Sequence, residues 1–337
     1  MKAVGYRGPA ALGEDGYFVD LDLPVPVPGP RDLLVRVRAV SVNPVDLKIR
    51  ARRPASPDAP VVLGFDAAGV VEAAGPEVEL FRPGDEVMYA GSVLRPGSNA
   101  ALQCVDERIA GTKPARLSFA EATSLPLTAL TAHELFFDCL RLARDAGPDT
   151  VALVHGGGGG VARLAVQLLR ALTGATVVAT SGSAASGERL RALGAHCVID
   201  YRGDWRAQLK DAGLPAPAVV GSAFTDAHAW AQIGRCIAPF GRIGYIDDVT
   251  TLDVAVLKQK GLTLVAEGMF NRSTFAAPDL VRQHEILTEV AALADAGRVQ
   301  PIADTVLEGL SAATLAEAHR LQAEGAGKIV VNFGAPG

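Results

Sequence analysis

The chain has 337 residues, of which 49 % are apolar and 20 % are charged, and its net charge is −5. This composition predicts a folded globular protein with room for two cores and excludes a disordered chain. The acidic balance offers no basic surface for nucleic acid, and no apolar run is long enough to span a membrane. Four scattered cysteines and an N-terminus without an apolar leader favour a cytoplasmic protein with reduced thiols.

The first part of the chain, to about residue 125, predicts a β-rich domain. Residues 32–42 begin by alternating apolar and charged side chains, as a half-buried strand does. Short β-branched runs within 61–75 and 82–91 break at glycine, which is typical of a partly closed barrel. From about Ser118 helix-forming residues take over, interrupted at Pro126.

Strands and helices then alternate, which favours a parallel sheet covered by helices. The predicted strands cover residues 150–155, 176–180, 197–199, 218–220 and 241–246, and the predicted helices cover 161–173, 205–212 and 227–237. The tail predicts helices at 278–296 and 311–323 and a final strand at 328–333. The tail thus returns to a mixed pattern, so a β-rich domain flanks an inserted α/β domain.

A glycine-rich turn joins the first of these strands to its helix. Gly157-x-Gly159-x-x-Ala162 fits the G-x-G-x-x-G/A pattern of dinucleotide-binding turns. The glycines allow a tight turn and a close approach of the backbone to a pyrophosphate, and the helix N-terminus supplies unpaired N–H groups. The expected cofactor contacts are Gly157, Gly158, Gly159, Gly160 and Val161.

The next strand end predicts which cofactor binds. An NAD-preferring fold places a carboxylate there to bind the ribose hydroxyls. This chain instead has Ser181, Gly182 and Ser183, and Arg189 and Tyr201 follow downstream. We therefore predict NADPH as the cofactor in preference to NADH.

Several motifs occur in the order found in one known family: Ser41–Lys48, Leu63–Val71, Phe81–Val87, Leu125–Ala132, the glycine turn, Pro239–Gly244 and Gly327–Val331. Together they resemble the medium-chain dehydrogenase/reductase superfamily, and most nearly its zinc-free quinone oxidoreductases, which are often labelled zinc-type alcohol dehydrogenase-like. The resemblance covers the whole chain. It implies an α/β protein with a GroES-like β-rich catalytic domain, residues 1–125 and 266–337, and a doubly wound parallel Rossmann domain, residues 126–265, that binds NADP.

The resemblance also bears on zinc. Alcohol dehydrogenases of the family bind a catalytic zinc through Cys and His-Glu in the first two motifs, where this chain resembles them at Asn43–Asp46 and Gly64–Asp66. Only Asp46 and Asp66 offer ligands there, whereas a catalytic zinc needs about three. The stretch 91–102, where a structural zinc would lie, has no Cys. We therefore expect neither zinc.

Without a metal to polarise an alcohol, the resemblance implies hydride transfer to an electrophilic small molecule such as a quinone. Asn43 and Asp46 would orient the substrate oxygen, Lys48 would stabilise it once reduced, and Thr128 would contact the nicotinamide. For Asn43 the alternative is an Asx turn around Pro44, for Lys48 a surface lysine, and for Thr128 a helix start.

Further cofactor contacts are expected at strand ends and in matching family segments: Ser181, Gly182, Ser183, Arg189, Tyr201, Phe224, Ile246, Asp247, Phe270 and Lys328. For Tyr201 and Phe270 core packing remains an alternative. Substrate choice is expected in the loops 51–60 and 271–278.

Two other functions remain open. A reductase of enal or enone double bonds would use the same fold and cofactor, and a non-catalytic NADPH-binding protein would share the fold. The resemblance also implies a homodimer formed by edge pairing of the two nucleotide-binding sheets.

Overall fold

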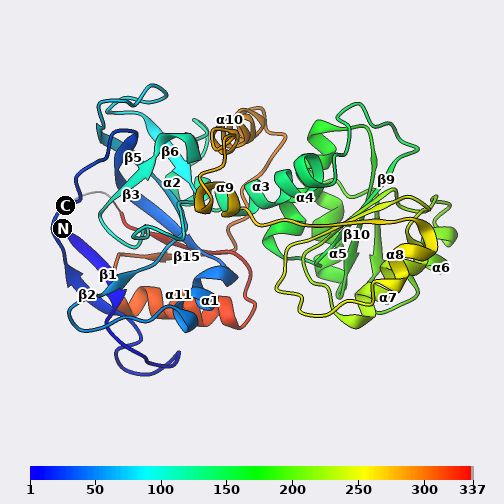
Figure 1. Cartoon of the computed structure of the whole chain (residues 1–337), viewed down its shortest axis with the longest axis horizontal. Coiled ribbons are helices and arrows are strands. Elements are labelled where there is room, and N and C mark those ends of the chain that lie inside the picture. The colour runs from blue at the N-terminus through cyan, green and yellow to red at the C-terminus, as the bar shows by residue number, and fades with distance from the viewer. Residues whose placement is uncertain (335–337) are drawn as a thin grey trace. The chain divides into compact units, whose positions relative to one another are not determined.

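The structure, a computed structural model, describes residues 1–334 and divides them into two compact units. Unit 1 comprises residues 1–127 together with the chain from Phe270 onward, and unit 2 comprises Thr128–Met269. These limits lie within a few residues of the domain limits expected from the sequence. Figure 1 shows the chain with its elements labelled.

Unit 1 is built on a seven-stranded sheet in the order β15-β16-β3-β5-β6-β8, with β7 paired to β3. The long β3 forms antiparallel pairs with β16, β5 and β7, so the C-terminal strand lies beside an N-terminal one. A smaller sheet has the order β2-β1-β4. The strands are β1 (Lys2–Tyr6), β2 (Val19–Asp22), β3 (Asp32–Val42), β4 (Val61–Val62), β5 (Asp66–Ala74), β6 (Glu86–Tyr89), β7 (Leu102–Asp106), β8 (Ala110–Thr112), β15 (Thr305–Glu308) and β16 (Ile329–Asn332).

The helices of unit 1 differ in length. They are α1 (Pro44–Arg52), α2 (Phe119–Ala122), α9 (Asn271–Thr274), α10 (Arg282–Asp295) and α11 (Ala312–Ala323), with a 3₁₀ turn η1 at Glu107–Ile109. Helix α10 packs so closely on β8 that a Cβ on Gly111 would lie 2.3 Å from the Cβ of Leu287. The helix expected from residue 278 begins only at Arg282. Ser311 caps α11 by accepting a hydrogen bond from the Thr314 N–H.

Unit 2 is a parallel sheet in the order β11-β10-β9-β12-β13-β14, the order of a doubly wound dinucleotide-binding fold. Helices α4 and α5 cover one face, and α6, α7 and α8 cover the other (Figure 1). The strands are β9 (Val151–His155), β10 (Thr176–Ser181), β11 (Cys197–Asp200), β12 (Val219–Ser222), β13 (Arg242–Tyr245) and β14 (Thr263–Ala266). The helices are α4 (Gly160–Leu172), α5 (Ala184–Ala192), α6 (Trp205–Asp211), α7 (Ala227–Cys236) and α8 (Ala255–Lys260).

The predicted α/β fold class, with its β-rich domain and its doubly wound sheet, is confirmed. The elements α8 and β14 were not expected, because their residues are polar or only half-buried and give weak periodicity. Before this sheet, α3 (Pro126–His133) continues into a π-helical turn η2 (Glu134–Cys139), where the sequence predicted helix. Within residues 1–334 no helix is both long and apolar enough to span a membrane.

Candidate functional site

Unit 1 contains a buried charge centre formed by Ser41, Asn43, Asp46, Asp66 and Lys328. Its middle is the Asp66 carboxylate, which is fully buried at the start of β5. Oδ2 of Asp66 accepts hydrogen bonds from Ser41 Oγ at 2.8 Å and Asn43 Nδ2 at 2.8 Å. Oδ1 accepts from the backbone N–H of Leu127 at 2.7 Å. Both carboxylate oxygens are therefore bound by donors from other elements of the unit.

The positive charge of the centre comes from Lys328, which directly precedes β16. Its Nζ lies 2.6 Å from Oδ2 of Asp66 and donates to Oδ1 of Asn43, also at 2.6 Å. The side chain of Lys328 is only 3 % exposed and that of Asp66 is 0 % exposed. This is a buried ion pair with an amide bridging both partners. It places Lys328 inside unit 1 with its ammonium directed at protein acceptors, whereas the sequence predicted a cofactor contact.

Asn43 and Asp46 meet at the start of α1. Asn43 is the N-cap residue, and its N–H donates to Oδ2 of Asp46 at 2.9 Å. The Asn43 side chain, however, bonds to Asp66 and Lys328 instead of closing a local Asx turn. Burial raises the pKa of the Asp46 carboxyl to about 7, and the nearby Asp66 acts in the same direction. Burial thus favours the protonated, neutral form of Asp46.

Two further predicted residues of unit 1, Lys48 and Phe270, are more exposed to solvent than the residues of the buried charge centre. Lys48 is exposed on α1. Phe270 is half-buried and packs edge-to-face on Phe65, with ring centroids 5.2 Å apart. That contact is the packing arrangement that the sequence left open as an alternative.

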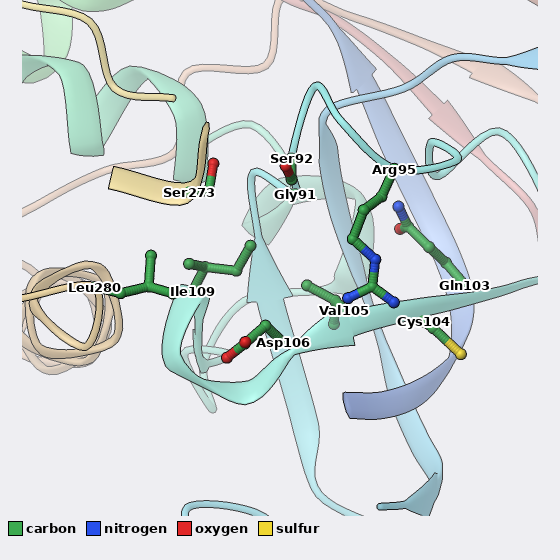
Figure 2. Close-up of a pocket in the computed structure, with 10 residues that line it drawn as sticks. All are labelled: Gly91, Ser92, Arg95, Gln103, Cys104, Val105, Asp106, Ile109, Ser273 and Leu280. Atoms are coloured by element: carbon green, nitrogen blue, oxygen red, sulfur yellow. The ribbon is translucent and has the colours of Figure 1, made fainter. Parts of the chain in front are cut away.

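A small cavity of about 100 Å³ is lined in part by Gly91, Ser92 and Arg95, within the stretch where a structural zinc was considered, and it also touches the predicted substrate loop at Ser273 (Figure 2). Arg95 reaches into it, and its guanidinium binds both oxygens of Asp32 at 2.7 Å. Cys104 is the one cysteine lining it, and burial raises the pKa of that thiol, which disfavours the metal-binding thiolate. The residues here do not fit a zinc.

The residues of the buried charge centre do not fit a catalytic zinc either. A zinc site needs about three ligands of Cys, His or carboxylate type. Within the described part of the chain no group of three such side chains is placed to hold a metal. Asp66, the central carboxylate, is already neutralised by an ammonium at 2.6 Å.

In unit 2 the glycine turn follows β9, at the point where the strand order reverses between β9 and β12. Ligands of such folds bind at this switch point. Gly156 and Gly157 have φ values of 145° and 60°, which side-chain-bearing residues rarely adopt. A Cβ on Gly158 would lie 2.7 Å from Ser186 Oγ, a buried hydroxyl with no hydrogen-bond partner within residues 1–334. Gly159 is the N-cap of α4, and Gly160 and Val161 form its first turn, so the N–H groups of the helix start face the turn.

The ends of β12 and β13 carry the next group of predicted residues. The N–H of Thr225 donates to Oδ2 of Asp247 at 2.7 Å, and Thr225 Oγ1 donates to Ser222 Oγ at 2.8 Å. The other oxygen of Asp247, Oδ1, is buried and has no partner in the structure. Phe224 is 58 % exposed. Ile246, half-buried, lies between β13 and Asp247.

A cavity of about 210 Å³ opens at the ends of β10 and β11. Ser181, Gly182 and Ser183, which were predicted as cofactor contacts, line this cavity, and Ser181 Oγ donates to the Ser183 carbonyl at 2.9 Å. Tyr201 lies beside it, and its ring covers Gly182. The tyrosine is 39 % exposed, so it is not a buried core residue.

The basic residues of this cavity differ from the predicted one. Arg191 and Arg202 line it, whereas Arg189 is exposed on α5 and is not among the lining residues. A carboxylate is also present: Asp200, at the end of β11, lines the cavity and binds Arg202 in a two-bond pair at 3.0 Å. The hydrogen bonds from Arg202 lower the pKa of Asp200. The sequence argument considered only the end of β10 and so missed this residue of the neighbouring strand, which the parallel register places opposite Ser181.

Thr128, which was predicted to contact the nicotinamide, is buried on α3 at the start of unit 2. Its helix begins at Pro126, in agreement with the helix-start alternative. Sequence reasoning did not find Ser41, Asp200, Arg191 and Arg202. Strand register was the missing signal for Ser41 and Asp200, because Ser41 lies opposite Asp66 across β3 and β5.

Comparison with known proteins links this architecture to others. The family model of the alcohol dehydrogenase GroES-like domain matches residues 29–132, and that of zinc-binding dehydrogenases matches residues 193–331. A zinc-type alcohol dehydrogenase-like protein of Staphylococcus aureus is 37 % identical, over 99 % of this chain and 100 % of its own. A Rhizobium etli protein described as a zinc-dependent alcohol dehydrogenase has a solved structure with a TM-score of 0.94 and 44 % identity, over 100 % of this chain and 99 % of that one.

Two similar proteins have names that specify a reaction. The solved structure of a Pseudomonas syringae quinone oxidoreductase has a TM-score of 0.78 and 25 % identity, over 98 % of this chain and 99 % of that one. The 2-methylene-furan-3-one reductase of Solanum lycopersicum is 38 % identical over 177 residues, which are 50 % of this chain and 44 % of that protein.

Proposed function

Since the chain belongs to the medium-chain dehydrogenase/reductase superfamily, we propose that it is an NADPH-dependent oxidoreductase that transfers a hydride to quinones without zinc. The family binds a nicotinamide cofactor, and the glycine turn at the strand-order reversal is the observation that carries this part of the proposal. The cofactor supplies the hydride. The protein's own residues bind it, orient it and hold the acceptor.

Several groups of unit 2 fit such a cofactor. The turn Gly156–Gly160 has backbone conformations and close contacts that leave no room for side chains at Gly156 or Gly158. The N–H groups at the start of α4 suit a pyrophosphate. The unpartnered Oδ1 of Asp247 is an acceptor suited to a ribose hydroxyl. These features support cofactor binding at the carboxyl edge of the sheet.

The preference for NADPH rests on the cavity at the ends of β10 and β11. Arg191 and Arg202 bring two positive charges to it, and arginine suits a phosphate because its planar donors bind two oxygens at once. Asp200 opposes this preference, but Arg202 neutralises it in a two-bond pair. In this proposal Arg191 and Arg202 take the role that was predicted for Arg189.

The zinc-free part of the proposal rests on the buried charge centre. An ammonium bound to Asp66 opposes a second cation at the same carboxylate by charge repulsion. An alcohol substrate would then lack the polarisation that a metal gives its oxygen. A quinone needs no such activation because it is already electrophilic, which is why we favour it.

Reduction of enals or enones is the second candidate. It is supported by the likeness to the 2-methylene-furan-3-one reductase over half of this chain. A non-catalytic NADPH-binding protein is the alternative outside enzymes. A homodimer through the edge strand β14, which has β13 as its one neighbour among the described strands, is part of the proposal.

The test is oxidation of NADPH, followed by absorbance, with a simple benzoquinone and separately with a simple enone, each with and without a chelator. We expect turnover of the quinone that the chelator leaves unchanged. Loss of turnover on chelation would contradict the zinc-free mechanism. Turnover of the enone alone would favour the second candidate, and tight NADPH binding with neither substrate turned over would favour the non-catalytic alternative.

A further inference from the structure

The buried charge centre holds a complete ion pair in a place where water does not reach. Asp66 is 0 % exposed and Lys328 is 4 % exposed. A carboxylate in such a place is strongly unfavourable unless a positive charge and hydrogen-bond donors accompany it. Here the ammonium supplies the charge, and Ser41, Asn43 and the Leu127 N–H supply the remaining donors.

The strand pairing explains why these residues meet. Ser41 of β3 lies directly opposite Asp66 of β5, and Val42 lies opposite Ile329 of β16. Asn43 directly follows β3 and Lys328 directly precedes β16, so the two residues lie side by side at the same end of these strands, next to Asp66. The lysine comes from a position 262 residues further along the chain than its partner.

The Asn43 side chain shows that the centre is organised around an ammonium. Its carbonyl oxygen accepts from Lys328, and its amide nitrogen donates to Asp66. A metal ion, by contrast, needs lone pairs directed at it from every side. Asp66 Oδ2 already accepts from Ser41, Asn43 and Lys328, so no lone pair of that oxygen remains available for a metal.

We propose that Lys328 is the built-in cation of this centre and that its ammonium occupies the acceptor atoms of Asp66 and Asn43 that a metal ion would need. The ammonium holds the ends of β3, β5 and β16 and the start of α1 together, and it excludes zinc from Asp66. The proposal rests on the proposed zinc-free function and deepens it.

The first test measures thermal unfolding of the cofactor-free protein in Lys328→Met, Asp66→Asn and the double variant. We expect Lys328→Met to lower the midpoint by many degrees, because it leaves a buried carboxylate without a countercharge. Adding Asp66→Asn removes that charge and is expected to restore most of the loss. A double variant no more stable than Lys328→Met would overturn the proposal.

Lys113→Met is the matched control. Lys113 is also buried and lies 3.1 Å from Glu86, but the Glu86 side chain is 48 % exposed and remains hydrated when the lysine is lost. The control variant should lose less than Lys328→Met and should gain nothing from Glu86→Gln. Equal behaviour of the two pairs would argue that Lys328 has no special role.

The second test adds zinc to the metal-free wild-type chain and measures bound metal by native mass spectrometry together with the thermal midpoint. We expect no stoichiometric zinc and no stabilisation. One bound zinc per chain with a raised midpoint would overturn the proposal, even if Lys328→Met does not fold. Neither test uses NADPH or a substrate, so failure of the quinone assay and failure of this proposal are distinguishable.

Discussion

The ring of Tyr201 covers Gly182 so closely that a Cβ on the glycine would lie 2.6 Å from Cε1 of the tyrosine. Gly182 ends the β10 side of the cavity that we assign to the cofactor, and Tyr201 follows β11. The absence of a side chain at Gly182 thus leaves the space that the ring of Tyr201 occupies.

Gly182→Ala is expected to displace Tyr201 and weaken NADPH binding by about tenfold, or ~1.4 kcal/mol. Titration of NADPH by fluorescence would measure this. Gly147→Ala is the control, because a Cβ there has no neighbour within 4 Å. Unchanged NADPH affinity in Gly182→Ala would remove Tyr201 from the binding site.

Arg202→Gln and Arg191→Gln are expected to lower the preference for NADPH over NADH, because each removes a positive charge from the cavity. Arg202→Gln also frees the Asp200 carboxylate, which then repels a phosphate. We expect the larger effect, about tenfold or more in the ratio of the two dissociation constants, from Arg202→Gln. Arg189→Gln is the comparison, because the sequence alone favoured that residue; a larger effect there would reverse our assignment.

Asp46 makes the stability of the fold depend on pH. Burial raises its pKa from 3.8 to about 7, so the folded state binds a proton that the unfolded state releases. Below pH 3.8 this carboxyl is protonated in both states and does not change the free energy of unfolding. As the pH rises from 3.8 toward 7, it lowers the free energy of unfolding by about 1.4 kcal/mol per pH unit. The free energy of unfolding of Asp46→Asn should therefore rise relative to wild type over that range and then level off. A pH-independent difference would show that Asp46 does not titrate in the folded state.

His319 gives the opposite pH dependence. It is fully buried beside Tyr17, whose hydroxyl lies 3.0 Å from Nδ1, and burial followed by the Arg50 charge lowers its pKa to about 3. Below pH 6.5 His319 is protonated in the unfolded chain but stays neutral in the folded protein. The free energy of unfolding therefore falls as the pH falls from 6.5 toward 3. His319→Gln, which keeps an acceptor for Tyr17, should lack this part of the loss in acid unfolding curves. Identical acid curves would contradict the assigned pKa.

Phe240 provides a test of the proposed homodimer. It is 82 % exposed at φ 61°, and its N–H donates to the Lys260 carbonyl just before the edge strand β14. We expect Phe240→Asn to shift the protein toward monomer in light scattering, because it removes an exposed ring while asparagine tolerates this backbone conformation. Phe275→Asn, at a 76 % exposed position of unit 1, is the control. A wild-type monomer at micromolar concentration would contradict the homodimer.

The sequence by itself predicted the elements whose pattern is local. The strand, glycine turn and helix at Val151–Leu172 follow from β-branched residues, glycines and apolar periodicity within one stretch, and the structure has them with small shifts at the ends. Seven short motifs in the family's order, together with the two-domain architecture, also identified the family, which the comparisons confirm. The predicted cofactor contacts and catalytic residues stay predictions, although their positions in each unit are now defined.

Tertiary structure decided what depends on residues far apart in the chain. The sequence singled out Asp66 and Lys328 separately, but only the pairing of β3 with β5 and β16 brings them to 2.6 Å from one another. It likewise places Arg191, Arg202 and Asp200, but not Arg189, along the cavity at the ends of β10 and β11. The physical reason is that hydrophobic periodicity and turn chemistry act over a few neighbouring residues, whereas the partner of a buried charge is chosen by strand register across the whole fold.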